Sequence, residues 1–227
     1  MEYLKIELLT HMPRALRDFY QDRLGLPVAR YDGSAVSLRV GATTIDFAPT
    51  NQGEPVYHLA FNIPENKIES ALEWLTSRAV LLPHYQSGRT IVDWPDWNAH
   101  SIYFLDPAGN VLEVIARHDL DNAVSGAFGP ADLLNVSELG LVVDDPHATL
   151  DLLRRELGVR NKSVLSDFGA VGDDHGLFIV SAVNRPWMPT DDRPARPFPA
   201  RVVIRHERPL ELAIPGAPYV VEGSDVV

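Results

Sequence analysis

Glu113 has the setting in this sequence that most clearly calls for chemistry. It lies within the apolar stretch 111–115, where valine, leucine and isoleucine surround it. A carboxylate in such a strand needs a cation, a hydrogen-bond donor or a metal ion beside it. The preceding residues, 106–110, read Asp-Pro-Ala-Gly-Asn, which is turn chemistry between two strands. Whichever group faces Glu113 therefore decides the chemistry of this region.

Strand alternation predicts which polar residues share a face with Glu113. Leu112 and Val114 would pack against a helix, which leaves Glu113 on the opposite face. Polar residues recurring on such a face indicate a lined cavity or a wet surface rather than a second core. The same alternation in residues 5–9, 43–47 and 58–63 adds polar partners, so we expect one helix-free face to carry Lys5, Glu7, Asp46, His58, Asn62 and Glu113.

The elements that position these residues repeat along the chain. A strand, a proline-marked turn and a helix with one apolar stripe begin at Lys5, again at His58 and again at Glu138. Further strands follow each helix, so each unit reads β-α-β-β-β. The stretch 201–214 looks like a fourth unit reduced to strands.

These repeats suggest a division of the chain. Residues 118–134 contain Asp-Asn, Ser-Gly and Gly-Pro pairs and read as a linker. We therefore predict paired β-α-β-β-β modules in residues 1–117. A third module and a truncated, degenerate fourth would occupy residues 135–227.

Composition excludes several classes of partner. The chain has a net charge of −11 without a basic run, which argues against nucleic acid and anionic membranes. It has no cysteine, so any metal would be held by histidine and carboxylates. Residues 1–5 do not begin a signal peptide and no apolar run reaches transmembrane length, so we expect a soluble, cytoplasmic protein.

The paired modules and the closing Asp-Pro-x-Gly-Asn-x-x-Glu of residues 106–113 resemble the vicinal oxygen chelate superfamily. That group includes glyoxalase I, extradiol ring-cleaving dioxygenases, fosfomycin resistance enzymes and the bleomycin resistance protein. The resemblance implies an α+β fold in which two curved mixed sheets form open cups with helices outside. It also implies a divalent metal on the cup floor, held by histidine or carboxylate from the first and last strands of each module.

Carried onto this sequence, the resemblance puts ligand positions at Lys5, Asp46, His58 and Glu113. An ammonium group cannot bind a metal unless it is deprotonated. The implied ligands are therefore Asp46, His58 and Glu113, with Glu7 one pleat along as a substitute. Such a set suits Fe²⁺, Mn²⁺ or Zn²⁺. In the alternative, no metal binds and Lys5 bridges Glu113 and Asp46 as their counter-charge.

The second cup departs further from the family pattern. Ring-cleaving dioxygenases with four modules place two histidines and one glutamate there. The matching positions in this sequence offer Glu138 and Glu211 without a histidine, and Arg205 has the strand parity to pair with them. We expect an ion-paired, metal-free second cup.

The remaining candidates line the rim. Trp94 and Trp97 flank a proline and would wall an aromatic or hydrophobic pocket, or else simply cover a sheet edge. Lys5 and Asn62 are the other candidate substrate contacts. His100, at the entry of the strand before the turn, and Glu7 are candidate acid–base residues, although an ordinary strand-end histidine has the same appearance.

Two functions follow from this pattern. The first is a glyoxalase- or dioxygenase-like metalloenzyme that acts on a small substrate with adjacent oxygens, including extradiol cleavage of a catechol-like ring if the metal is Fe²⁺. The second is a metal-free protein that sequesters small molecules, similar to bleomycin resistance proteins. Open sheet edges also leave a homodimer in consideration.

Overall fold

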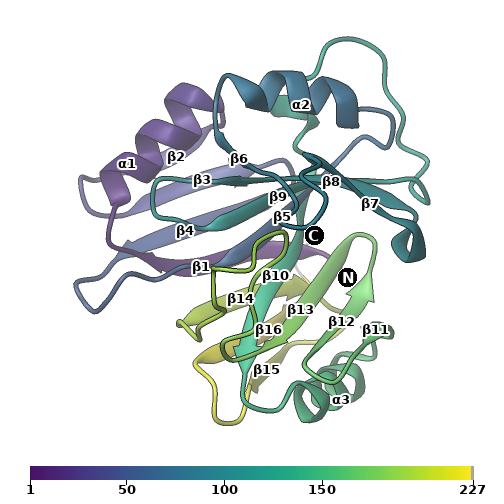
Figure 1. The fold of residues 1–227 in the computed structure, drawn as a ribbon. Helices are drawn as coiled ribbons and strands as arrows, with labels where there is room; N and C mark the ends of the chain where they lie inside the picture. The colour runs from purple at the N-terminus through teal and green to yellow at the C-terminus, as the bar shows by residue number, and fades with distance from the viewer. Residues whose placement is uncertain (226–227) are drawn as a thin grey trace.

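Two mixed β-sheets with helices packed against them make up the computed structural model, which describes residues 1–225 (Figure 1). One sheet has seven strands, in the order β15 (Leu210–Ala213), β16 (Tyr219–Ser224), β14 (Ala200–Arg205), β1 (Tyr3–Thr10), β4 (Thr43–Pro49), β3 (Val36–Val40) and β2 (Val28–Tyr31). The other has nine, in the order β11 (Asn161–Val164), β12 (Phe168–Asp173), β13 (Gly176–Ala182), β10 (Asn135–Val143), β5 (His58–Ile63), β9 (Val111–Arg117), β8 (Ala99–Leu105) and β6 (Val80–Leu82), with β7 (Ile91–Trp94) also paired to β8.

Three helices follow the first strands of three successive modules. The helix α1 (Pro13–Arg17) continues as a π-helical segment, Asp18–Arg23, and packs on β3 and β4. The helices α2 (Ile68–Thr76) and α3 (Pro146–Leu157) pack on the nine-stranded sheet. Short 3₁₀ turns occur at Pro95–Trp97 and Pro130–Asp132. The α+β fold of repeated modules is confirmed, and strands β14, β15 and β16 follow without a helix among them.

The pairing of the modules differs from the expectation. Strand β1 runs antiparallel to β14, and β5 runs antiparallel to β10. The first module therefore shares a sheet with the last strands of the chain, while the second shares a sheet with the third. Alternation along a strand identifies its apolar face, but it does not say which neighbour the strand's edge will take. The prediction that the first two modules form one cup is wrong for that reason.

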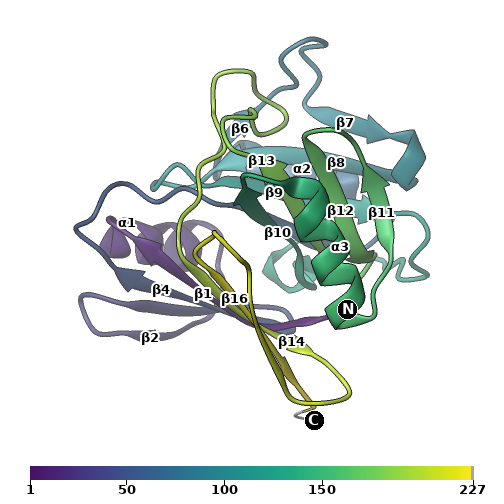
Figure 2. The ribbon, with the colours of Figure 1, turned by 90° about the horizontal axis from the view of Figure 1, so that it is seen from below.

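The apolar faces of both sheets and the helices share one hydrophobic core. Tyr3 of β1 reaches the other sheet, where its ring packs edge-on against Phe178 at 5.4 Å and its hydroxyl donates to the Leu177 carbonyl at 2.5 Å. The opposite faces point away from this core, and that of the nine-stranded sheet carries a second apolar cluster that includes Tyr103, Ile179 and Trp187. Figure 2 shows the two sheets from below. Within residues 1–225, no helix is long and apolar enough to span a membrane.

The turn before Glu113 is built as its composition predicts. The Asp106 carboxylate accepts hydrogen bonds from the backbone amides of Ala108 at 2.9 Å and Asn110 at 3.0 Å. Gly109 has a φ of 85°, which suits glycine. Tyr20 donates to the same carboxylate at 3.0 Å, which ties the turn to the segment after α1. The turn thereby fixes the β8–β9 register and the placement of Glu113 opposite Tyr103.

Candidate metal centre

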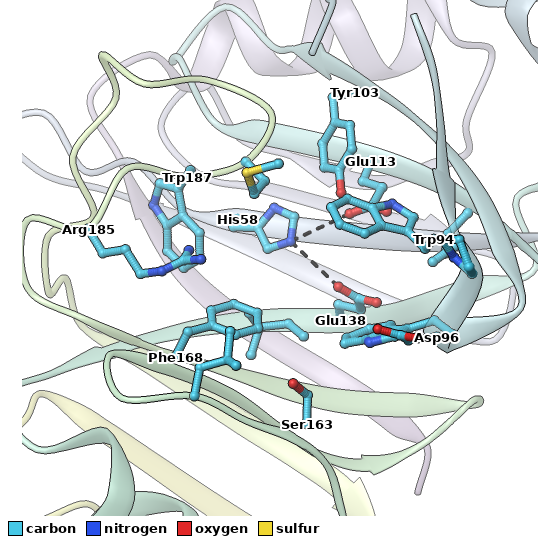
Figure 3. A pocket seen from close by; sticks show the side chains of 16 residues that line it. His58, Trp94, Asp96, Tyr103, Glu113, Glu138, Ser163, Phe168, Arg185 and Trp187 are labelled. Carbon is cyan, nitrogen blue, oxygen red and sulfur yellow. Dashed lines mark ion pairs between the residues drawn. The ribbon is translucent and has the colours of Figure 1, made fainter. Parts of the chain in front are cut away.

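Three buried side chains from three adjacent strands converge on the polar face of the nine-stranded sheet. They are His58 of β5, Glu113 of β9 and Glu138 of β10, which are 5%, 2% and 3% exposed. One ligand atom from each lies within 4.8 Å of the other two, so the group could hold a metal ion. Nε2 of His58 lies 3.7 Å from Glu113 and 3.6 Å from Glu138 (Figure 3).

Strand register explains why these residues meet. Ala60 of β5 pairs with Glu113 on the parallel neighbour and with Glu138 on the antiparallel neighbour. His58 lies one pleat away on the same face. The small side chain of Ala60 leaves the space between the two glutamates open, so the imidazole and both carboxylates can face one another.

The orientation of His58 leaves one ring nitrogen for the carboxylates. Its Nδ1 lies 3.0 Å from the Val111 carbonyl, which favours the tautomer whose Nδ1–H donates to that oxygen. Nε2 then faces Glu113 and Glu138, where it offers a lone pair to a metal ion when the ring is neutral and a proton to the glutamates when the ring is charged. A backbone hydrogen bond of this kind is the usual support for a histidine that binds a metal.

The electrostatics show a shortage of positive charge. Burial, together with the charge of Glu138, raises the pKa of Glu113 to about 8. Burial would also raise the pKa of Glu138, but the hydrogen bond from His58 and the charge of Arg117 outweigh it and lower that pKa. Burial favours neutral His58, yet the two glutamates raise its pKa. One imidazole and two carboxylates whose negative charge is not fully neutralised are a suitable ligand set for a divalent cation.

Arg117, which the sequence analysis overlooked, holds Glu138 in place. The Arg117 side chain is completely buried, and its Nη2 donates to Glu138 Oε1. Its Nε donates to Asn62 Oδ1 at 3.2 Å, and the guanidinium lies 5.6 Å from the Trp97 ring centre. Asn62, a predicted substrate contact, thus orients Arg117. Alternation along β9 puts Arg117 on the same face as Glu113, and this pattern in the sequence could have identified Arg117 as a neighbour of the centre.

The three side chains lie at the floor of a cavity of about 320 Å³. Trp94 and Trp97 line it, which is one of the two placements left open for their loop, and Trp94 donates to Ser101 at 2.7 Å. Tyr103 pairs with Glu113 in the β8–β9 register, and Ser101 lies two residues before it on the same face of β8. Apolar and aromatic side chains make up most of the remaining wall, among them Ile115, Leu165, Phe168, Ile179, Trp187 and Met188.

Close packing at Gly140 brings Trp187 onto the floor of the cavity. A Cβ atom at Gly140 would lie 2.5 Å from the Trp187 ring and 3.1 Å from the Cβ of His58. The Trp187 and His58 rings are 5.1 Å apart. Trp187 belongs to the proline-rich segment after β13, whose composition indicates a loop and gives no sign that it reaches the centre.

A fourth ligand position follows from the repeat and is apolar. In the second module, Glu113 pairs with Ala60, which lies two places after His58. In the third module, the residue two places after Glu138 is Gly140, and it pairs with Ile179. Ile179 therefore occupies the position that Glu113 has in the second module. Ile179 lines the cavity. The centre therefore offers three candidate protein ligands, and on its fourth side it faces hydrocarbon and the cavity.

The structure separates the other predicted ligands from this centre. Lys5 and Asp46 lie in the seven-stranded sheet, as does Glu7, so the expected single face with His58 is wrong. Nζ of Lys5 is 2.5 Å from Glu7 and 2.9 Å from Asp46. Lys5 therefore neutralises Asp46 but not Glu113. Among the described residues, Asp46 belongs to no cluster able to hold a metal.

The seven-stranded sheet repeats the same geometry with ion pairs. Its register places Lys5 where the other sheet has His58, Asp46 in place of Glu113, Arg201 in place of Glu138 and Glu222 in place of Ile179. Arg201 pairs with Glu222. The expected grouping of Glu138 with Glu211 and Arg205 is wrong, because Glu138 lies in the other sheet and Arg205 binds Glu2 at 2.7 Å.

His100 does not face the cavity. It alternates with Ser101 and Tyr103 along β8 and so lies on the opposite face from both. Its Nδ1 lies 2.8 Å from Nε2 of His118, whose Nδ1 lies 3.1 Å from Glu65. Neither His100 nor Glu7 is placed to act as an acid or base at this centre.

Comparison with known proteins supports the fold. No protein-family model and no curated protein sequence matches the chain. A solved structure from Bacillus subtilis, provisionally described as a dioxygenase, matches 100% of this chain and 86% of its own at 14% identity, with a TM-score of 0.66. A glyoxalase I variant from Zea mays matches 98% of this chain and 91% of its own at 13% identity, with a TM-score of 0.54. The chain therefore has the fold of glyoxalase and dioxygenase proteins, as its resemblance to the vicinal oxygen chelate superfamily predicted.

Proposed function

We propose that this protein is a metal-dependent enzyme of the vicinal oxygen chelate type, whose ligands are His58, Glu113 and Glu138. The observation that carries the proposal is the convergence of these three side chains on the floor of a largely apolar cavity. A divalent Fe, Mn or Zn ion bound there would supply Lewis-acid polarisation of substrate oxygens and, in the case of iron, access to dioxygen chemistry.

The residues around the centre have separable tasks. Arg117 keeps Glu138 ionised and oriented. Tyr103 and Ser101 of the neighbouring strand β8 flank the Glu113 carboxyl group on the face that it occupies. Tryptophan rings from two loops exclude water and offer flat apolar surfaces to a planar substrate.

The substrate that fits this arrangement is small and carries two adjacent oxygens. The apolar side chain at the fourth ligand position, Ile179, contributes no donor, so two substrate oxygens have room beside three protein ligands. Aromatic walls favour a catechol-like ring, and extradiol cleavage is then the iron-dependent reaction. With another divalent ion, isomerase or lyase chemistry on a hydroxycarbonyl compound fits the same site.

A metal-free binding protein is the second candidate. Its specific support is that the two glutamates raise the pKa of His58, so an imidazolium can take the place of the cation. The aromatic cavity would then sequester its ligand without chemistry.

The test is metal-dependent turnover. Purified protein is loaded with Fe²⁺, Mn²⁺ or Zn²⁺ and assayed for oxygen uptake with substituted catechols and for isomerisation of hydroxycarbonyl substrates. We expect turnover with one ion that is lost in Glu138→Gln and retained in Asp46→Asn, which alters the matching position of the other sheet. Binding of catechols that is equally tight in excess chelator, without turnover, would favour the second candidate.

A further inference from the structure

One wall of the cavity is a chain segment, residues 183–195, whose backbone is held in place. The Asn184 amide donates to the Ala195 carbonyl at 2.9 Å, and the Ala195 amide donates back to the Arg185 carbonyl at 2.9 Å. The Trp187 amide donates to the Arg193 carbonyl at 2.9 Å. This ladder presents Arg185 and Trp187 to the cavity from an ordered backbone rather than from a free loop.

The Arg185 side chain is positioned by three contacts, one of which is a hydrogen bond from its Nη1 to the Pro186 carbonyl at 3.4 Å. Its guanidinium carbon lies 4.4 Å from the centre of the Phe168 ring, and its Nε lies 3.4 Å from Asp167 Oδ2. The Asp167 side chain is 55% exposed, so solvent screens that ion pair. Figure 3 shows the guanidinium reaching in between Phe168 and Trp187. Arg185 therefore enters the cavity with its charge only partly neutralised.

Besides the three candidate ligands, the described residues that line the cavity include two charged side chains, Arg185 and Asp96. Among the lining residues that the structure describes, Arg185 is the one permanently cationic side chain. Asp96 belongs to the other wall, beside Trp94 (Figure 3). The Trp187 ring packs against His58 and the Phe168 ring lies under Arg185, and with Ile179 they give the lining hydrocarbon and aromatic surface. A ligand that fills this space meets a cation at one end and the metal centre at the other.

We propose that Arg185 binds the carboxylate of the substrate, and that the substrate is a hydrophobic or aromatic acid with its adjacent oxygens at the opposite end. This inference rests on the proposed function of the His58 centre. Guanidinium and carboxylate groups form paired, charge-assisted hydrogen bonds, and the surrounding rings weaken the competition from water. Arg185 thus selects acids over neutral compounds of the same shape.

The experiment compares two ligands of matched size on Zn²⁺-loaded protein, so that dioxygen turnover does not intervene. The probes are 3,4-dihydroxyphenylacetate and 4-ethylcatechol, and binding is measured by titration calorimetry. We expect the acid to bind at least about tenfold more tightly, as one charged hydrogen-bonded contact would give. In Arg185→Gln we expect that preference to vanish while the affinity for 4-ethylcatechol stays unchanged.

Asp167→Asn is the matched control, because it removes the ion-pair partner and keeps the guanidinium. We expect this variant to retain or increase the preference for the acid. Equal binding of both probes by the native protein, binding of neither, or a preference that survives in Arg185→Gln would overturn the assignment of Arg185. A weaker affinity for both probes in Arg185→Gln would indicate a purely structural role and would also overturn it. Metal analysis measures Zn²⁺ uptake separately, and a protein that takes up no Zn²⁺ would overturn the proposed metal centre rather than the role of Arg185.

Discussion

Removing Arg117 should destabilise the protein far more than a typical single substitution does. The Arg117 side chain is completely buried and pairs with Glu138, whose side chain is 4% exposed. Arg117→Met keeps the length of the side chain but leaves Glu138 as a buried carboxylate without its guanidinium. Breaking a buried pair by removing one partner costs about 3–5 kcal/mol. We expect a loss of that size in the free energy of unfolding of the metal-free protein.

The double variant Arg117→Met with Glu138→Gln distinguishes this reason from simple loss of packing. Once Glu138 is neutral, the penalty for its isolation disappears, so the double variant should be more stable than Arg117→Met alone. Urea unfolding at pH 7, followed by fluorescence and circular dichroism together, gives the coupling energy, for which we expect about 2 kcal/mol or more. Additive effects, or a loss below about 1 kcal/mol in Arg117→Met, would refute the assignment of Arg117 as the partner of Glu138.

Three further outcomes are expected. Because the pKa of Glu113 is raised from 4.5 to about 8, the native metal-free chain keeps a proton that the unfolded chain loses, so its stability should fall as the pH rises from about 4.5 to about 8. The urea midpoint of Glu113→Gln should change less over this range, and an unchanged pH dependence would contradict the shift. Asp106→Asn replaces an acceptor with an amide donor facing Tyr20 and Asn110, and should cost about 2 kcal/mol in unfolding experiments; a neutral effect would show that the turn does not need the carboxylate. Ile179→His adds a donor at the fourth ligand position and should increase Zn²⁺ affinity at least about tenfold in a chelator competition assay, whereas weaker binding would contradict the register argument.

The faces of individual strands could be predicted from the sequence, but their neighbours could not. Alternation along residues 111–115 correctly put Glu113 opposite the apolar core, and the turn at Asp106 was evident from its residue types. Lys5 and His58 also occupy equivalent positions in their modules, as the repeat predicted. Both possible pairings of modules bury the same apolar faces, however, so the local pattern could not decide that Glu138 rather than Asp46 would face His58.

The cavity wall shows a second limit of prediction from local pattern. Trp94 and Trp97 stand beside a strand with clear alternation, and their place near the rim could be anticipated. Trp187 and Arg185 lie in a proline-rich segment without periodicity, which indicates only a loop. Their position depends on backbone contacts such as that from Tyr85 to Pro189 at 2.9 Å, which join segments far apart in the sequence.

Metal analysis of protein purified without chelator tests the central claim most directly. We predict about one divalent ion per chain in the native protein and in Asp46→Asn, and loss of that ion in His58→Ala and Glu138→Gln. These two losses should occur with the fold intact by circular dichroism. A native protein that neither retains nor takes up an ion, or an ion that is lost in Asp46→Asn but kept in Glu138→Gln, would contradict the assignment of the centre to the nine-stranded sheet.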